Sequence, residues 1–194
     1  DSAMAAVSIS YPFTLANTGI STLIGMGSAS ILSRAIGKKD QGTIDKIMGN
    51  LIALNLIFSL IVMAIGIVFT RQILMLSGAS GEILDLAVRY LRIIFAGSLF
   101  VNFAQSSNMI MRGEGLLKRA MLFSGGSAIM NIILDPILIW ALSPYQMGID
   151  GAAYATVISQ IAYAAASLWD FKKKSKNVKI HAIHVDKGLF SEIL

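Results

Sequence analysis

The sequence contains no cysteine and only three prolines among its 194 residues. The lack of cysteine excludes a disulfide framework and cysteine-based metal sites, but it says nothing more about the cellular compartment. Charged residues are also scarce, at 14% of the chain, whereas soluble domains typically carry about 25%. Residues 51–69 and 121–134 contain no charged residue at all. Because a soluble helix shows a polar stripe at every third or fourth residue, these stretches are typical of membrane helices.

Signatures of catalysis and of nucleotide binding are missing from the sequence as well. There is no GxxxxGK[ST] motif, and the glycines of residues 25–27 lie inside an apolar stretch rather than between a strand and a helix. His181 and His184 have no acidic or cysteine partners at metal-site spacing. The net charge of +5 comes from basic residues at the ends of apolar stretches. We therefore expect no enzyme, no cofactor and no nucleic-acid partner.

Several stretches are apolar and long enough to cross a bilayer core of about 30 Å. They cover residues 8–36, 47–69, 88–111, 120–142 and 152–171. The sequence therefore predicts an all-α fold, a polytopic transmembrane bundle of about five spanning helices over residues 1–171. Residues 172–194 are predicted to form a cytoplasmic linker with a lead-in to a further span.

The basic residues predict the orientation of this bundle. With five spans, all but three of the 16 lysines and arginines fall on one side of the membrane, the exceptions being Arg71, Arg89 and Arg92. Cytoplasmic loops carry an excess of basic residues. We therefore expect a multi-pass protein of the plasma (inner) membrane, with the first residue of this chain outside and the last one in the cytoplasm. The chain starts at Asp1 rather than at Met, so we interpret it as an internal part of a longer protein.

Two outer connections carry local signals. Residues 77–92 are predicted to be an amphipathic helical entry, with Ser80 as its cap and Glu82 in its first turn. Residues 143–145 read Ser-Pro-Tyr and predict a tight turn.

Asp135 is the one acidic residue well inside an apolar stretch, and Asn131 precedes it by four residues. Residues four apart share a helix face, so the two side chains are predicted to lie together. Pro136 has no N–H, which leaves the carbonyl group of Ile132 without its helical partner and predicts a helix hinge. The Asp135 carboxylate, the Asn131 amide oxygen and the freed carbonyl group together suit a hard cation such as Na⁺. The same carboxyl could instead carry a proton, because burial changes how readily a carboxyl ionises. The alternative is an Asp that only hydrogen-bonds to a neighbouring helix.

Other polar side chains lie within the predicted spans. Thr156 would add a hydroxyl to the Asp135 cluster if the fourth and fifth spans pack together, as their short connection favours. Asn102, Gln105 and Asn108 gather in the third span. Such polarity favours a water-filled cavity that these residues line, and hydrogen bonding between helices is the alternative.

Four segments carry a family resemblance. They are residues 25–30 (GMGSAS), 32–40 (LSRAIGKKD), 131–139 (NIILDPILI) and 148–156 (GIDGAAYAT). Together they resemble the multidrug and toxic compound extrusion (MATE) family of efflux transporters. The resemblance covers nearly the whole chain, and the segments occur in the expected order.

The resemblance implies a protein of twelve helices in two six-helix lobes. This chain would supply helices 2–6 of the first lobe and the interlobe linker, and its partner would be the second lobe of the same protein. The family exports drugs or amphipathic, often cationic compounds by antiport with H⁺ or Na⁺. Asn131, Asp135 and Thr156 would form part of its first-lobe cation site, which also uses an Asp on a first helix that this sequence does not contain. No metal other than Na⁺ at Asp135 is expected.

The expected mechanism is ion-coupled antiport. Asp135 would alternate between a loaded and a free state, and its change of charge near Pro136 would bias the lobes between inward-open and outward-open states. The organic substrate and membrane lipid would be its other partners. One alternative is a lipid-linked saccharide flippase of the same superfamily, which would need a mainly basic cavity that these spans do not show. The other is a membrane scaffold that transports nothing, which would tolerate apolar residues at positions 131 and 135.

Overall fold

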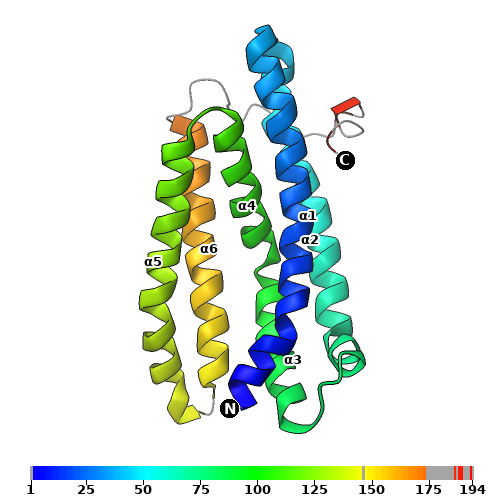
Figure 1. The fold of residues 1–194 in the computed structure, drawn as a ribbon, viewed down its shortest axis with the longest axis vertical. Helices are drawn as coiled ribbons and strands as arrows, with labels where there is room; N and C mark the ends of the chain where they lie inside the picture. Colours follow the sequence, from blue (N-terminus) through cyan, green and yellow to red (C-terminus); the bar gives the residue numbers. More distant parts are fainter. Residues whose placement is uncertain (1, 146, 174–185, 187, 190–192, 194) are drawn as a thin grey trace.

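The computed structural model describes residues 2–145, 147–173, 186, 188, 189 and 193 of the chain. In this part of the chain there are six α-helices, one short 3₁₀ helix and no strand. The elements are α1 (Ser2–Lys38), α2 (Gln41–Leu76), α3 (Gly81–Ala96), α4 (Ser98–Gly113), α5 (Leu117–Leu142), η1 (Ser143–Tyr145) and α6 (Gly148–Lys173). The expected all-α class is thus confirmed. The helices stand side by side in a bundle, with α1 and α2 on one side and the α5–α6 pair on the other (Figure 1).

Three helical segments are long and apolar enough to cross a membrane: α1, α2 and the run Leu117–Tyr145 that joins α5 to η1. The helices α3 and α4 are each only 16 residues long. The predicted span 88–111 is therefore two helices, with Gly97 between them. An added Cβ at Gly97 would lie 2.6 Å from Val157 Cγ2 of α6. The break thus lies where the backbone contacts a neighbouring helix, which an apolar stretch does not reveal.

The helix ends differ from the sequence expectations in detail. Helix α1 begins at Ser2 and not near residue 8, and α6 begins at Gly148, four residues before the predicted start. Ser80 occupies the position before α3, but its side chain makes no capping hydrogen bond. The predicted turn after α5 is the 3₁₀ helix η1.

Asp40 supplies a side-chain cap that the sequence analysis did not name. One Asp40 carboxylate oxygen accepts a hydrogen bond from the Thr43 hydroxyl at 2.7 Å, and the other accepts one from the Thr43 backbone N–H at 3.2 Å. These two bonds lower the pKa of Asp40. The first turn of α2 is thereby stabilised where the chain reverses direction after α1.

The apolar core forms two clusters. One cluster joins α1, α2 and α4 and includes Ile24, Leu51 and Ile110. The other joins the start of α1, the end of α2 and α3, and includes Leu74 and Leu91.

A polar layer crosses the bundle between these clusters. The Asn102 amide of α4 donates to Asn17 Oδ1 of α1 at 3.2 Å and to Ser59 Oγ of α2 at 3.0 Å. The Ser106 hydroxyl lies 2.8 Å from the Ser21 carbonyl oxygen and 3.2 Å from Asn55 Oδ1. Asn17, Asn55, Ser59, Asn102 and Ser106 are called the middle polar layer below; each is at most 2% exposed. These bonds join three helices where apolar packing alone would leave their relative heights loosely determined.

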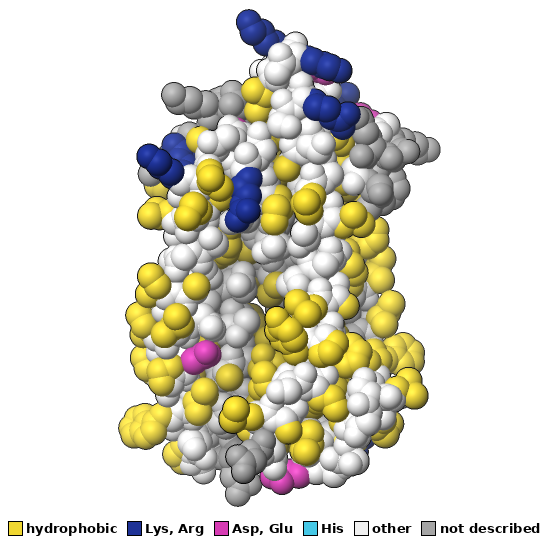
Figure 2. Space-filling view, viewed as in Figure 1, with side chains coloured by type: hydrophobic (Ala, Val, Ile, Leu, Met, Phe, Trp, Pro, Cys, Tyr) yellow, Lys and Arg dark blue, Asp and Glu magenta, His cyan; other side chains and the backbone are white. Residues whose placement is uncertain are grey.

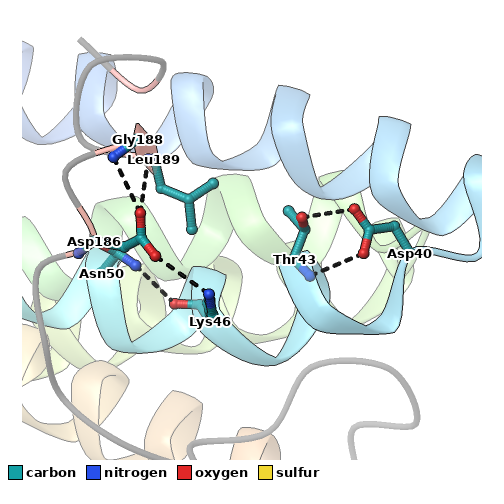
Figure 3. Close-up of polar contacts among 7 residues, drawn as sticks. All are labelled: Asp40, Thr43, Lys46, Asn50, Asp186, Gly188 and Leu189. Carbon is teal, nitrogen blue, oxygen red and sulfur yellow. Dashed lines mark hydrogen bonds and ion pairs between the residues drawn. The ribbon is translucent and has the colours of Figure 1, made fainter.

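A short segment after α6 contacts the start of α2 (Figure 3). The Lys46 ammonium lies 3.3 Å from Asp186 Oδ2, and the Asp186 backbone N–H donates to Asn50 Oδ1 at 2.7 Å. The hydrogen bond from Lys46 is the main cause that lowers the pKa of Asp186. Leu189 and Ile193 join the cluster of α1, α2 and α4. The rest of the predicted linker, including Lys174, Lys176, Lys179, Lys187, His181 and His184, lies outside the described residues.

Candidate cation site

The candidate site lies between α5 and α6, which pack together as an antiparallel pair. Toward the end of α6, Arg119 of α5 pairs with Asp170 at 3.3 Å. Further along, the Ser127 hydroxyl donates to the Ser159 carbonyl oxygen at 3.0 Å. Because these partners succeed one another in opposite chain directions, Asn131 of α5 comes to lie opposite Thr156 of α6.

The three residues predicted to hold a cation lie together. The Asn131 amide nitrogen is 3.5 Å from Asp135 Oδ1 and 3.4 Å from Thr156 Oγ1. The Thr156 hydroxyl also donates to the carbonyl oxygen of Ala152, at 3.1 Å. The two Asn131 distances are at the long limit of hydrogen bonding. The carboxylate, amide and hydroxyl therefore converge on one region without forming tight bonds with one another.

A polar cavity adjoins this cluster, with a volume of about 280 Å³. Its lining comes from α4, α5 and α6 and consists mainly of amide and hydroxyl side chains: Gln105, Ser124, Ser127, Ala128, Asn131, Thr156, Ser159, Gln160 and Tyr163. Figure 2 shows that this face of the molecule is hollowed between the α5–α6 pair and α1. The cavity therefore offers neutral hydrogen-bonding groups to a ligand, with the Asp135 carboxylate close by.

The structure separates the three polar residues predicted on the third span. Gln105 lines the cavity. Asn102 lies instead in the middle polar layer. Asn108 donates to the Tyr163 hydroxyl at 2.6 Å and to the Ala120 carbonyl oxygen at 3.1 Å. Asn102 and Asn108 thus make the bonds between helices that the sequence analysis gave as the alternative to a cavity role.

Pro136 lies within α5, which continues without a break from Leu117 to Leu142. Its role as a hinge therefore stays a prediction. Only Ala120 and Ser127 of α5 are buried in the described structure. Along most of its length, α5 is held by its contact with α6 and exposes a largely apolar surface.

Tyr90 of α3, a residue that the sequence analysis did not single out, lies near the site. Its half-buried ring lies close enough to Asp135 for the two groups to interact electrostatically. A tyrosine hydroxyl can donate to a carboxylate or accept from a donor. The neighbouring Arg89 and Arg92 led to an interpretation of this stretch as an outer connection, so no sequence signal directed attention to Tyr90.

An ion pair between a buried carboxylate and a partly exposed arginine fixes α3 against the start of α6. Arg89 pairs with Asp150, whose side chain is only 3% exposed. Removing one partner of such a pair leaves an uncompensated charge, which is strongly destabilising. The pair therefore holds α3, and with it Tyr90, in place beside α6.

Comparison with known proteins gives the family. The family model described as MatE matches residues 1–137, which is more than half of the chain. The chain belongs to the MatE family. The expectation from the four resembling segments is thus confirmed.

Two relatives can be aligned with almost the whole chain. The multidrug export protein MepA of Staphylococcus aureus (strain MRSA252) is 32% identical over 192 residues, which are 98% of this chain and 42% of MepA. The probable multidrug resistance protein YoeA of Bacillus subtilis (strain 168) is 29% identical and matches 95% of this chain and 39% of YoeA. The chain therefore spans about two fifths of the length of these relatives.

Two solved structures of a multidrug resistance MATE family transporter of the MOP superfamily are similar in fold. The inward-facing conformation matches with a TM-score of 0.92 and 30% identity, over 99% of this chain and 44% of the other. The outward-facing conformation matches with a TM-score of 0.90 and 29% identity, over 98% and 42%. This part of a MatE protein therefore has nearly the same fold in both conformations.

Proposed function

We propose that the protein exports drugs or other amphipathic, often cationic organic compounds by antiport with H⁺ or Na⁺, and that Asp135 couples the ion to the substrate. The observation that carries the proposal is the convergence of Asp135, Asn131 and Thr156 beside a polar cavity. An acidic residue inside a spanning helix is costly to insert, so it is expected where a function needs it.

The ion would bind at the Asp135 carboxylate, with the Thr156 hydroxyl oxygen as a neutral ligand, and the Asn131 oxygen would join them after the amide turns over, since its nitrogen faces both groups in the described structure. Oxygen ligands of this kind suit Na⁺, and the carboxylate alone suffices for a proton. Binding of either ion removes the negative charge next to the cavity. A cationic substrate would then lose its attraction to the site, which gives exchange of ion for substrate a simple electrostatic basis.

The orientation belongs to the same proposal. The connection between α1 and α2 and the end of α6 would lie in the cytoplasm, and the first residue of this chain outside. Lys38 ends α1, and Lys172 and Lys173 end α6. Figure 2 shows the Lys and Arg side chains of this face gathered at the end of the bundle where α1 meets α2. An excess of basic residues is typical of the cytoplasmic side of a plasma-membrane protein.

Dye efflux tests the proposal in inverted membrane vesicles that contain the protein at full length. A proton gradient or a sodium gradient is imposed separately, with Asp135 intact and as Asp135→Asn. We expect efflux to need one of the gradients and to be lost in Asp135→Asn, because an amide cannot exchange a proton and binds Na⁺ without a charge.

Asp85→Asn is the matched control, since it makes the same chemical change at an exposed residue that pairs with Arg71 outside the cavity. This variant should transport like the unaltered protein. Unchanged, gradient-dependent efflux in Asp135→Asn would refute the proposal and favour a scaffold or a flippase.

A further inference from the structure

Helices α5 and α6 lie backbone against backbone at Gly151, about one helical turn from the candidate site. A Cβ added at Gly151 would lie 2.6 Å from the Leu138 carbonyl oxygen, 2.7 Å from its carbonyl carbon and 2.8 Å from the Ile139 nitrogen. All three are backbone atoms of α5, so no change of rotamer can relieve the overlap. The spacing of the two backbones at this level therefore requires a residue without a side chain.

The contact lies next to the ion ligands on both helices. Leu138 follows Asp135 by three residues on α5, and Gly151 precedes Thr156 by five residues on α6. At about 1.5 Å per residue, both lie within about 8 Å of the ligands along their helix axes. The Asn131–Thr156 distance of 3.4 Å is already at the long limit of a polar contact. A small increase in the helix spacing would therefore separate the ligands of α5 from the ligand of α6.

The weak burial of α5 determines how the helices would respond. Ala120 and Ser127 are its only buried residues in the described structure, so little besides α6 holds it in place. The start of α6 is held by the ion pair of the buried Asp150 with Arg89. An added methyl group at position 151 would therefore displace α5 and leave the rest of the bundle in place.

We infer that Gly151 is a positioning residue of the ion site: its close backbone contact with Leu138 sets the distance between Thr156 and the Asn131–Asp135 pair, and so sets the affinity for the coupling ion. This inference rests on the proposed function, in which these three residues bind the ion. Gly151 touches neither ion nor substrate and acts only through the spacing of the helices.

Gly148 provides a matched control on the same helix. An added Cβ there would lie 3.7 Å from both Ile139 Cγ2 and the Ile139 carbonyl oxygen, which is ordinary van der Waals contact. Gly148→Ala and Gly151→Ala thus make the same change one helical turn apart and differ in whether α5 must move.

The test measures dye efflux by the full-length protein in vesicles as a function of the concentration of the coupling ion. Gly151→Ala should raise the half-maximal ion concentration by about tenfold, the effect that changes around metal ligands commonly have on affinity. Gly148→Ala should leave that concentration unchanged. A purely structural role of Gly151 would lower the amount of folded protein and leave the ion dependence of the remainder unaltered, which would overturn the inference.

A second pair of variants covers the case in which Gly151→Ala does not accumulate. The methyl group added by Gly97→Ala would press on the Val157 side chain of α6, next to Thr156 in the sequence. This variant should therefore also raise the half-maximal ion concentration. Adding Val157→Ala makes room for the new methyl group and should restore the half-maximal ion concentration of the unaltered protein. If Gly97→Ala leaves the half-maximal ion concentration unaltered, the spacing of α5 and α6 does not set the affinity for the ion, which would overturn the inference.

The result with Asp135→Asn separates the two proposals. If Asp135→Asn abolishes ion dependence while Gly151→Ala behaves like Gly148→Ala, only the positioning role is wrong. If Asp135→Asn leaves ion dependence intact, the proposed function itself fails.

Discussion

At the scale of single residues, the contact of Asp186 with Lys46 ties the segment after α6 to the start of α2 (Figure 3). Two further hydrogen bonds reach the Asp186 carboxylate from the backbone N–H groups of Gly188 and Leu189. The carboxylate thus contacts both Lys46 of α2 and the backbone of Gly188 and Leu189; these contacts are called the Asp186 joint below. Leu189 is 9% exposed, so this joint also covers an apolar side chain.

The pH dependence of this joint follows from the lowered pKa of Asp186. A depressed carboxyl pKa stabilises the folded contact above the unfolded pKa of about 3.9, and the stabilisation is lost as the pH falls through the lower, folded pKa. We therefore expect the joint to be unchanged between neutral pH and about pH 4 and to open only below that. Labelling of Leu189→Cys with dithiodipyridine, which modifies thiols at acidic as well as neutral pH, measures this, because the chain has no cysteine of its own. Lys46→Met should raise labelling already at neutral pH, and equal labelling in both backgrounds would contradict the assignment.

The sequence predicted part of the site residue by residue. Asn131 and Asp135 are four apart on one helix, so local periodicity alone places them together. Predicting that Thr156 joins the site required the correct pairing of α5 with α6, which the short connection between them favoured. The position of Tyr90 depends on how α3 packs against α1, α2 and α6, and no local pattern in the sequence contains that arrangement.

At the scale of helices, the middle polar layer predicts that replacing one amide side chain of α4 costs more stability than replacing a neighbouring one. Asn102→Leu leaves Asn17 Oδ1 and the Ser59 hydroxyl without their donor, and should lower stability by about 1–2 kcal/mol, the upper range for hydrogen bonds between membrane helices. Gln105→Leu removes only one contact with Thr22, at 3.5 Å, and should cost less. Thermal unfolding in detergent measures both. A larger loss for Gln105→Leu would show that the layer does not join the helices.

The helices themselves were largely predictable, and their interruptions were not. Long apolar stretches indicated α1, α2 and α5 because hydropathy is an average over many residues. The same averaging hid the break at Gly97, since the residues on both sides are apolar. That break depends on the approach of Val157 from α6, a contact between residues 60 positions apart.

At the scale of the whole molecule, the described helices match an inward-facing and an outward-facing relative about equally well. Their TM-scores of 0.92 and 0.90 against inward-facing and outward-facing relatives differ little. Packed cores with buried polar links have discrete arrangements and do not deform continuously. The described helices are therefore expected to move together as one body in the proposed transport cycle.

Spin-label distances test this expectation within the full-length protein. Leu23→Cys on α1 and Leu122→Cys on α5 carry exposed side chains, so labels there should not disturb packing. We expect the same distance distribution with and without the ion gradient or substrate, because both labels belong to one body. A shift of several ångströms would instead show that α5 moves relative to α1 during the cycle.

The middle polar layer also constrains how the protein is made. Asn17 and Asn55 lie on α1 and α2, whereas their partners Asn102 and Ser106 lie on α4, which is synthesised later. Polar groups are costly in lipid until they are paired. The first two helices therefore enter the bilayer with the Asn17 amide and the Asn55 oxygen lacking their α4 partners, and the bundle can close around them only once α4 has been inserted.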